Sequence, residues 1–418
     1  MMASNVDVEI ILQQFSPNVT ASSLKEAARK YLDQMVVRPN SVINIDNETI
    51  SALSHVKMII VGEIPNYNKS FVDFNELHVN WFIYRFDTDG PLQQNEDVGD
   101  QEVIMFTQLT LPSLCLINLW ENLYYDNNIK QNLLKYAQTI MEFSDKGVDP
   151  SIISCNRVIL LHGPPGTGKT SLSKALAQKL TIRMSGRYSS GILIEINSHS
   201  LFSRWFSESG KLVNTMFNKI NEFVENKSIL VCVLIDEVES LAHARTKCLS
   251  GSEPSDSIRV VNALLTQLDQ IRRHSNVLIF ATSNMTESID LAFIDRADIK
   301  QYLGNPSLQA IYKVYHSCIN ELIKAKIIKD QILEPIEHII SDNDKAHSME
   351  TEQLLELCKR SLGLSGRALR KIPFLAHALF TDGSDISLSK FLMAMDKAVD
   401  KEFTERSYFN HANDVKIR

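Results

Sequence analysis

The sequence predicts an α/β protein in which helices wrap a parallel β-sheet, with a separate α/β domain before it and a helical lid after it. Three observations support this fold class. A glycine-rich loop joins an apolar run to a stretch of helix formers within residues 157–180. Further apolar strands (192–196, 229–235 and 277–281) alternate with helical segments up to about residue 304. After Asn305-Pro306 the strand pattern stops and helical periodicity continues, at 311–324 and 351–362.

The bulk composition is that of an ordinary globular chain. The 418 residues predict two or three domains, and the net charge of −7 argues against nucleic acid as the main ligand. Mean hydropathy is −0.10, and the longest apolar run, Ile229–Ile235, is far shorter than the roughly 20 residues of a membrane span. The first residues carry no basic secretory signal, and the six cysteines include no C-x-x-C pair. We therefore expect a protein of the cytoplasm and nucleus, with no membrane partner.

Residues 1–100 are expected to form the separate N-terminal α/β domain. Strand-like segments at 6–15, 55–61 and 77–86 accompany a helix at 22–35 with a serine cap. The stretch has no glycine loop and no cluster of catalytic side chains, which favours a partner- or substrate-binding module. The polar segment 89–101 indicates a linker, which we extend over 101–129. The nucleotide domain would then cover 130–304, opening with a helix at 130–143, and the lid 305–418.

Residues 163–170 match every fixed position of the phosphate-loop pattern G-x-x-x-x-G-K-[ST]. A strand, a glycine turn and a helix N-terminus direct consecutive backbone N–H groups at one anion. Lys169 would reach the outer phosphates, and the Thr170 hydroxyl would ligate Mg²⁺. The predicted nucleotide-binding residues are Gly163, Pro164, Pro165, Gly166, Thr167, Gly168, Lys169, Thr170 and Ser171.

Two strands end in polar residues that suit hydrolysis. The apolar run Ile229–Ile235 leads into Asp236, which would hold Mg²⁺, and Glu237, which would orient and deprotonate the attacking water. Taken alone, the two carboxylates could instead cap the next helix. Asn284 ends another strand and could hold the lytic water or the γ-phosphate, although asparagine is also common in turns. No Asn-Lys-x-Asp guanine motif occurs, so ATP is the predicted nucleotide.

Together these segments resemble the AAA+ ATPases from about residue 115 to the C-terminus. The resemblance implies that Arg296, in Asp295-Arg296-Ala-Asp298, is an arginine finger acting on a neighbouring subunit, and hence a ring that is typically a hexamer. The chain departs here from the commonest pattern, which has two arginines around Pro-Gly. A surface ion pair between Arg296 and Asp298 is the alternative.

Two further segments obtain a role only through this resemblance. Ser365 would cap a lid helix, so that Arg367 lies in its first turn like the sensor-2 arginine of the family. Arg370 competes for that role, and a solvated arginine is the alternative to both. Trp205 and Phe206 align with the pore loop that grips polypeptides in AAA+ translocases, and a pair packed in the core is the alternative.

Longer strings narrow the resemblance to the pachytene checkpoint protein 2 family. They include Trp-Phe-Ser-Glu-Ser-Gly-Lys-Leu-Val (205–213), Leu-Ser-Gly-Arg-Ala-Leu-Arg-Lys-Ile-Pro-Phe-Leu-Ala-His-Ala (364–378) and the segments 116–126, 253–263 and 294–302. The resemblance implies a homohexameric, ATP-driven remodeller of HORMA-domain proteins in meiotic chromosome axes and the spindle checkpoint, with substrate and adaptor at the N-terminal domain. The alternatives are another AAA+ unfoldase or severing ATPase, and a nucleotide-dependent scaffold.

Overall fold

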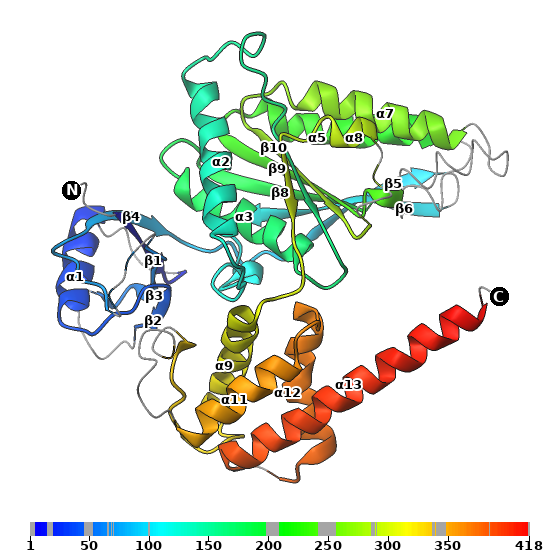
Figure 1. Cartoon of the computed structure of the whole chain (residues 1–418). Coiled ribbons are helices and arrows are strands. Elements are labelled where there is room, and N and C mark those ends of the chain that lie inside the picture. Colours follow the sequence, from blue (N-terminus) through cyan, green and yellow to red (C-terminus); the bar gives the residue numbers. More distant parts are fainter. Residues whose placement is uncertain are drawn as a thin grey trace. The chain divides into compact units, whose positions relative to one another are not determined.

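The computed structural model divides the chain into two compact units, which are described separately (Figure 1). Unit 1 comprises Met1–Glu121, Lys130–Gly163 and Lys169–Tyr302, and unit 2 comprises Asn122–Ile129, Pro164–Gly168 and Leu303–Arg418. The structure describes all residues except 1–4, 15–19, 46–52, 65–66, 68, 70, 99–100, 198–208, 241–255, 286–288, 290, 337–338, 340–347, 384 and 417–418.

A four-stranded mixed sheet with one helix forms the N-terminal part of unit 1 (Figure 1). Its strand order is β2-β3-β1-β4, from β2 (Ser41–Asn44), β3 (Val56–Val61), β1 (Asn5–Leu12) and β4 (His78–Tyr84). Strand β1 pairs antiparallel with β3 and parallel with β4. Because side chains alternate along a strand, one face of β1 (Val6, Val8, Ile10) packs with the buried side of helix α1 (Ala21–Asp33).

The predicted helix and strands of this part are present, and one detail of the prediction was wrong. Thr20, not a serine, occupies the N-cap of α1, and its side chain makes no capping hydrogen bond. The helix is held instead by its apolar stripe, Leu24, Ala28 and Leu32, which is fully buried.

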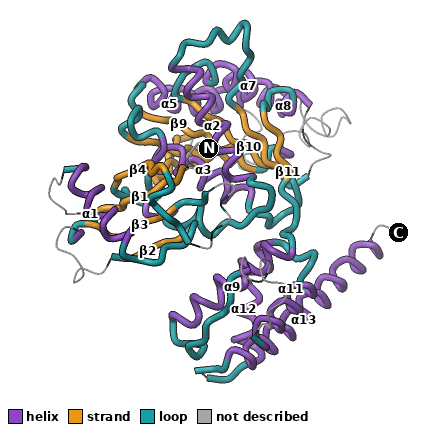
Figure 2. The backbone as a smooth tube through the Cα atoms, turned by 60° about the vertical axis from the view of Figure 1, so that its left-hand side comes forward, coloured by secondary structure: helices purple, strands orange, loops and turns teal. Residues whose placement is uncertain are grey.

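A seven-stranded sheet of order β11-β7-β10-β9-β8-β6-β5 forms the centre of unit 1 (Figure 2). Five of its strands are parallel: β7 (Val158–His162), β8 (Ser190–Asn197), β9 (Ile229–Asp236), β10 (Val277–Ser283) and β11 (Ile299–Tyr302). Helices α5 (Ser209–Glu225) and α7 (Asp256–Ile271) share one core with these strands. The remaining helices of unit 1 are α2 (Ile129–Asp145), α3 (Lys169–Arg183) and the short α8 (Leu291–Ile294). Figure 1 shows α5 and α7 on one side of the sheet and α3 on the other.

The prediction of a linker at 89–101 was wrong, because most of this segment belongs to the sheet. Strand β5 (Leu92–Val98) pairs with β6 (Gln101–Leu111), and β6 pairs antiparallel with β8. Strand β5 lies at the edge of the sheet, where backbone hydrogen bonds to β6 hold it and its side chains need not be buried. Its sequence can therefore be polar, like that of a linker. A 3₁₀ turn, Leu114–Leu116, follows β6. The other expected domain boundaries stay predictions.

Unit 2 contains the helical lid that the sequence predicted. Its main helices are α9 (Leu308–Lys324), α11 (Met349–Arg360), α12 (Gly366–Phe380) and α13 (Leu388–Lys416), which share one apolar core. Three of them begin with a serine, at 307, 348 and 365, whose side chain accepts a backbone N–H of the first turn. The predicted cap at Ser365 is therefore confirmed.

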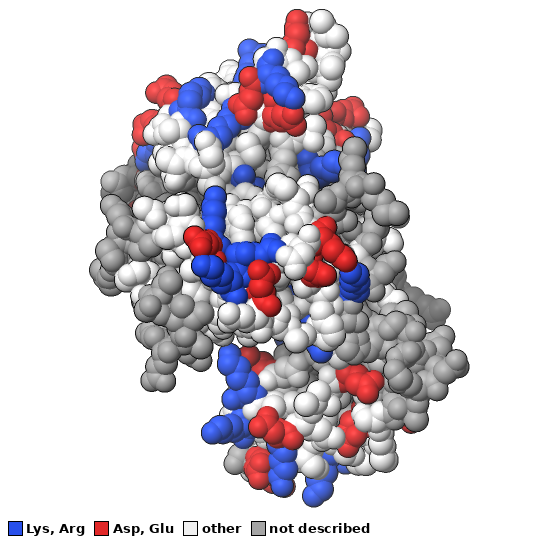
Figure 3. Space-filling view, turned by 90° about the vertical axis from the view of Figure 1, so that its left-hand side faces the viewer, with Lys and Arg blue, Asp and Glu red and all other residues white. Residues whose placement is uncertain are grey.

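The surface carries both signs of charge. On the face in Figure 3, the described lysine and arginine side chains lie interspersed with aspartate and glutamate. The described side chains of this face therefore form no large field of a single sign. Among the described residues, none of the helices combines the length and apolar character that crossing a membrane requires.

Candidate nucleotide-binding and hydrolysis site

The carboxyl end of β9 and the start of α3 bring two predicted metal ligands together in unit 1. The Thr170 hydroxyl donates to Asp236 Oδ1 at 2.9 Å. The Thr282 hydroxyl, near the end of β10, donates to the same oxygen. Hydroxyl and carboxylate oxygens are the ligands that Mg²⁺ prefers. The donor set of Thr170 and Asp236 therefore fits a hard divalent cation.

Lys169 is the first residue of α3 and is 5% exposed. Its ammonium group donates to the Gly163 carbonyl at 2.8 Å. The Gly163 N–H in turn donates to the Ser283 carbonyl at 3.2 Å, which ties the start of the phosphate loop to β10. Thr170 and Ser171 follow Lys169 in the first turn of α3. Both therefore lie at the N-terminal end of the helix, which favours anions.

Glu237 has an unusual backbone conformation, with φ of 60°. A non-glycine residue in this region is uncommon and must be stabilised by its surroundings. Its N–H donates to Thr282 Oγ1 at 3.2 Å, and the next N–H, of Val238, donates to the Thr282 carbonyl at 2.9 Å. Thr282 therefore fixes the turn that carries Glu237.

Asn284 lies beside Glu237, as the strand ends suggested. Its side-chain amide donates to Glu237 Oε1 at a long 3.4 Å, and its backbone N–H donates to Glu239 Oε1 at 3.1 Å. Sequence reasoning missed Thr282 and Glu239. Thr282 could have been found, because it belongs to the Thr-Ser-Asn segment that ends with Asn284. For Glu239, the only indication in the sequence was its position two residues after Glu237.

The middle of the phosphate loop, residues 164–168, belongs to unit 2. Gly166 and Gly168 have φ of +80° and +91°, which favour glycine. An added Cβ would lie 2.8 Å from Ser365 Oγ at Gly166 and 2.5 Å from Tyr125 Oη at Gly168. Both glycines are therefore required by conformation and by close neighbours.

Tyr125 contacts this loop directly. Its hydroxyl lies 3.1 Å from the Thr167 carbonyl and 3.2 Å from the Gly168 carbonyl, and it donates to these oxygens. Burial raises the pKa of the Tyr125 phenol, so the hydroxyl keeps its proton at neutral pH. The sequence singled out the surrounding string 116–126 but gave Tyr125 no role.

The two sensor-2 candidates have different neighbours. The Arg367 N–H, in the first turn of α12, donates to the Gly166 carbonyl at 3.0 Å. The Arg370 guanidinium donates to the Asn122 carbonyl. Arg367 thus adjoins the phosphate loop through its backbone, and the sensor role of either arginine stays a prediction.

Arg296 follows α8 and forms a bidentate ion pair with Asp269 of α7, at 3.0 and 2.7 Å. The alternative partner, Asp298, instead accepts the backbone N–H groups of Asn156 and Val158. Trp205 and Phe206, the predicted pore-loop residues, lie outside the described residues.

Two family models match this chain. Residues 159–305 match the ATPase family associated with various cellular activities (AAA), and residues 307–403 match the TRIP13-like, AAA+ ATPase lid C-terminal domain. The matches cover the five parallel strands with the phosphate loop and most of the helical lid, whereas β5 and β6 lie outside them.

The chain is also similar to named relatives and solved structures. It is 54% identical to the pachytene checkpoint protein 2 homolog of Rattus norvegicus over 83% of this chain and 81% of the relative. The homolog of Xenopus tropicalis is 47% identical over 97% of this chain and 96% of its own length. The structure of C. elegans PCH-2 is 36% identical, with a TM-score of 0.76, covering 96% of this chain and 99% of that one.

A more distant structure supports the fold alone. The Trip13-containing complex of E. coli MS115-1 matches at 18% identity and a TM-score of 0.53, over 69% of this chain and 94% of that one. The family assignment rests instead on relatives that are about half identical over most of the chain, together with the AAA and TRIP13-like lid models. The chain therefore belongs to the pachytene checkpoint protein 2 family of AAA+ ATPases, enzymes that hydrolyse ATP.

Proposed function

We propose that this chain is an ATP-driven remodeller that engages HORMA-domain proteins and partly unfolds them, in meiotic chromosome axis and spindle checkpoint control. The main support is that the chain is about half identical to pachytene checkpoint protein 2 homologs. Its structure also pairs Thr170 with Asp236 and Asn284 with Glu237 at the proposed ATPase site. A distant structural neighbour is itself described as a HORMA:CdnC:Trip13 complex, which supports the substrate class. The proposed place of action is the nucleus, at chromosomes, and the cytoplasm.

The residues of the site divide the chemistry between them. Lys169 and the N–H groups of the phosphate loop bind the ATP phosphates, while Thr170 and Asp236 hold Mg²⁺. When bound, Mg²⁺ neutralises charge that develops on the phosphates. Glu237 accepts the proton of the attacking water, and the Asn284 amide orients the Glu237 carboxylate.

Work on a substrate needs more than one subunit. In the proposed homohexamer, Arg296 reaches the nucleotide of a neighbouring subunit and supplies positive charge there. Trp205 and Phe206 grip the substrate polypeptide, and Arg367 senses the nucleotide from the lid. The N-terminal domain binds the substrate together with an adaptor.

The deciding experiment is a remodelling assay on a folded HORMA-domain protein with its adaptor, with and without ATP. Unfolding is followed by protease sensitivity of the substrate, and ATP turnover is measured in the same samples. Glu237→Gln is expected to retain ATP and trap substrate, whereas Trp205→Ala is expected to hydrolyse ATP without remodelling.

The outcomes separate the alternatives. Normal turnover by Glu237→Gln would remove the assignment of the catalytic base. An intact HORMA substrate in the presence of a turning-over wild-type chain would contradict the proposed substrate. Microtubule severing would then favour the severing alternative, and assembly of partners unaffected by Glu237→Gln would favour a scaffold.

A further inference from the structure

A buried carboxylate of the N-terminal sheet forms ion pairs with α3, the helix that follows the phosphate loop. Glu9 lies on β1 and is 1% exposed. Its Oε1 atom lies 2.6 Å from Lys179 Nζ and 2.9 Å from Arg183 Nη1, and both cations are on α3. Its Oε2 atom accepts a hydrogen bond of 2.7 Å from the Tyr84 hydroxyl on β4. One carboxylate therefore connects two strands to the helix.

Two more acidic residues complete this ion cluster, which we define as Asp7, Glu9, Glu121, Lys179 and Arg183. Glu121 lies 2.7 Å from Lys179, and Asp7 lies 2.9 Å from Arg183. The Arg183 guanidinium also lies over the Phe82 ring, 4.2 Å from its centroid. Each cation is thus held by more than one partner.

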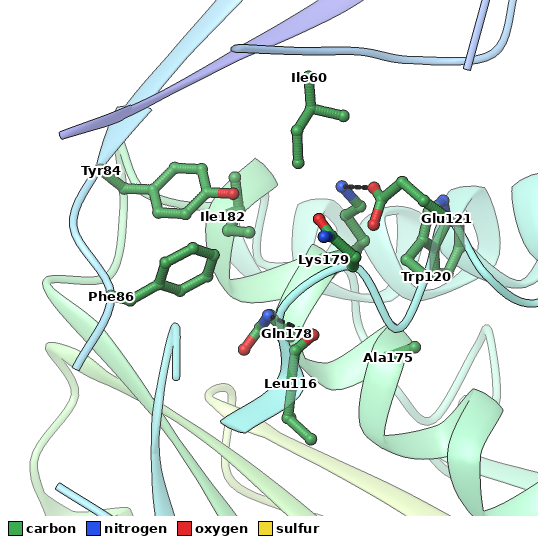
Figure 4. Close-up of a pocket in the computed structure, with 11 residues that line it drawn as sticks. Ile60, Tyr84, Phe86, Leu116, Trp120, Glu121, Ala175, Gln178, Lys179 and Ile182 are labelled. Carbon is green, nitrogen blue, oxygen red and sulfur yellow. Dashed lines mark hydrogen bonds and ion pairs between the residues drawn. The ribbon is translucent and has the colours of Figure 1, made fainter. Parts of the chain in front are cut away.

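The alternation of β1 explains why charges occupy this interface. Val6, Val8 and Ile10 face the core beneath α1, so Asp7 and Glu9 must face the opposite side of the sheet. That side is covered by α3: Figure 4 shows Tyr84 and Ile60 of the N-terminal sheet opposite Lys179 and Ile182. Strand β1 therefore has buried side chains on both faces of the sheet, and the face toward α3 carries the buried charge of Glu9.

The charge of Glu9 depends on its partners. Burial would raise the pKa of this carboxyl, but the neighbouring Lys179 and Arg183 cations hold it low, at about 2. Glu9 is consequently ionised at neutral pH. Removing one cation leaves a buried charge with fewer partners, which is strongly unfavourable. The N-terminal sheet therefore resists separation from α3.

Helix α3 links this cluster to the nucleotide site. It begins with Lys169 and Thr170, and Lys179 lies ten residues further, about 15 Å along the helix axis. Residues 175–182 are all buried, so the helix has little freedom to bend. A movement of the N-terminal sheet must either break the ion cluster or carry α3 with it.

We propose that Glu9 and Lys179 are positioning residues of the ATPase site, through which the N-terminal domain sets the placement of α3 and hence of Lys169 and Thr170. A partner that moves the N-terminal domain would then change nucleotide binding and turnover, and nucleotide would change the affinity for that partner. The identity of the partner rests on the proposed function, whereas the coupling itself does not.

The test compares three variants of the full chain. Lys179→Met removes the cation and keeps a long side chain, and Lys179→Arg restores a cation. Lys174→Met is the matched control, because Lys174 is on the same helix but pairs with Glu195 of β8, at 2.7 Å. The readouts are kcat and KM for ATP, and the affinity for the fluorescent nucleotide mant-ADP.

We expect Lys179→Met to weaken mant-ADP binding by about threefold to tenfold, as coupling between distant sites typically does. Lys179→Arg should recover most of this loss, and Lys174→Met should bind like the wild type. A folded Lys179→Met chain with wild-type mant-ADP affinity, kcat and KM would overturn the proposal.

A second measurement covers the case in which Lys179→Met does not fold. Amide hydrogen exchange of β1 and β4 is compared with and without ATP in the Glu237→Gln chain, with α1 on the opposite face of the sheet as reference. Exchange in β1 and β4 that changes with ATP relative to α1 supports the coupling, and unchanged exchange overturns it. A wild-type chain that hydrolyses ATP but does not remodel HORMA-domain proteins, together with this exchange change in Glu237→Gln, would contradict only the proposed substrate.

Discussion

Arg296 is held by Asp269 through two hydrogen bonds, of 3.0 Å from Nε and 2.7 Å from Nη2. Such a bidentate pair fixes both the direction and the plane of a guanidinium group. The Arg296 cation in turn lowers the pKa of Asp269, so the carboxylate remains charged. Asp269 thus orients the residue that we propose acts on a neighbouring nucleotide.

We predict that Arg296→Ala lowers kcat by about a hundredfold or more, as loss of an arginine finger does, while nucleotide affinity stays near the wild type. Lysine cannot reproduce the bidentate geometry, so Arg296→Lys should rescue little. The measurement is steady-state ATP turnover together with mant-ADP binding.

Mixed assemblies test whether Arg296 acts between subunits. Lys169→Ala subunits cannot use ATP themselves but still present Arg296 to a neighbour. Mixing them with Arg296→Ala subunits should therefore restore part of the turnover that neither variant has alone. Turnover that never exceeds the sum of the two separate variants would show that Arg296 does not act on a neighbour.

Thr282→Val should reduce both stability and turnover. Its hydroxyl donates to Asp236 and accepts the N–H of Glu237, so valine leaves the N–H of a strained residue without its partner. We expect a loss of about 1–3 kcal/mol in the free energy of unfolding, measured by urea titration, and a lower kcat. The control is Thr266→Val, because Thr266 is an exposed residue of α7 whose hydroxyl donates to the Asn262 carbonyl of its own helix. Equal effects of the two variants would contradict the role given to Thr282.

Tyr125→Phe removes only the hydroxyl that contacts the phosphate loop at Thr167 and Gly168. One neutral hydrogen bond contributes about 0.5–1.5 kcal/mol, so mant-ADP binding should weaken by roughly twofold to tenfold. The neighbouring Tyr124 bonds to Ser317 instead, and Tyr124→Phe should bind nucleotide normally. The affinity of both variants for mant-ADP is measured by isothermal titration calorimetry. Equal affinities for Tyr125→Phe and the wild type would contradict a role of Tyr125 in nucleotide binding.

The sequence predicted the parts of the site that depend on local pattern. The phosphate loop is one contiguous segment, and Asp236 and Glu237 come at the end of an apolar strand. Their positions can therefore be predicted from the sequence alone. The contact of Tyr125 with the loop depends on how the chain folds back, and no local rule places it. Glu9 and Lys179 are 170 residues apart, and their pairing follows only from the packing of the N-terminal sheet on α3.

The fold shows the same division. Apolar strands and amphipathic helices were predicted because burial imposes a period on their sequences. Strand β5 was missed because its edge position requires backbone pairing and little burial, so its polar residues resemble those of a linker.

The ion cluster predicts a specific loss of stability in acid. The pKa of Glu9 is lowered from 4.5 to about 2 in the folded chain, although burial alone would raise it, because Lys179 and Arg183 stabilise its charged form. The contribution of a carboxylate whose folded pKa is depressed is fully present above pH 4.5 and disappears as pH falls toward 2. A shift of this size corresponds to about 3 kcal/mol of unfolding free energy at neutral pH.

Comparing the wild type with Glu9→Gln isolates this contribution, because all other titrating groups are shared. Urea unfolding at a series of pH values should show Glu9→Gln less stable at pH 7, with a difference that narrows as pH falls from 4.5 toward 2. The exposed pair Glu26–Lys30 on α1 supplies the control, and Glu26→Gln should leave stability nearly unchanged throughout. A Glu9→Gln difference that stays constant down to pH 2 would mean that the charge of Glu9 does not hold the N-terminal sheet on α3, and that its shape and hydrogen bonds suffice.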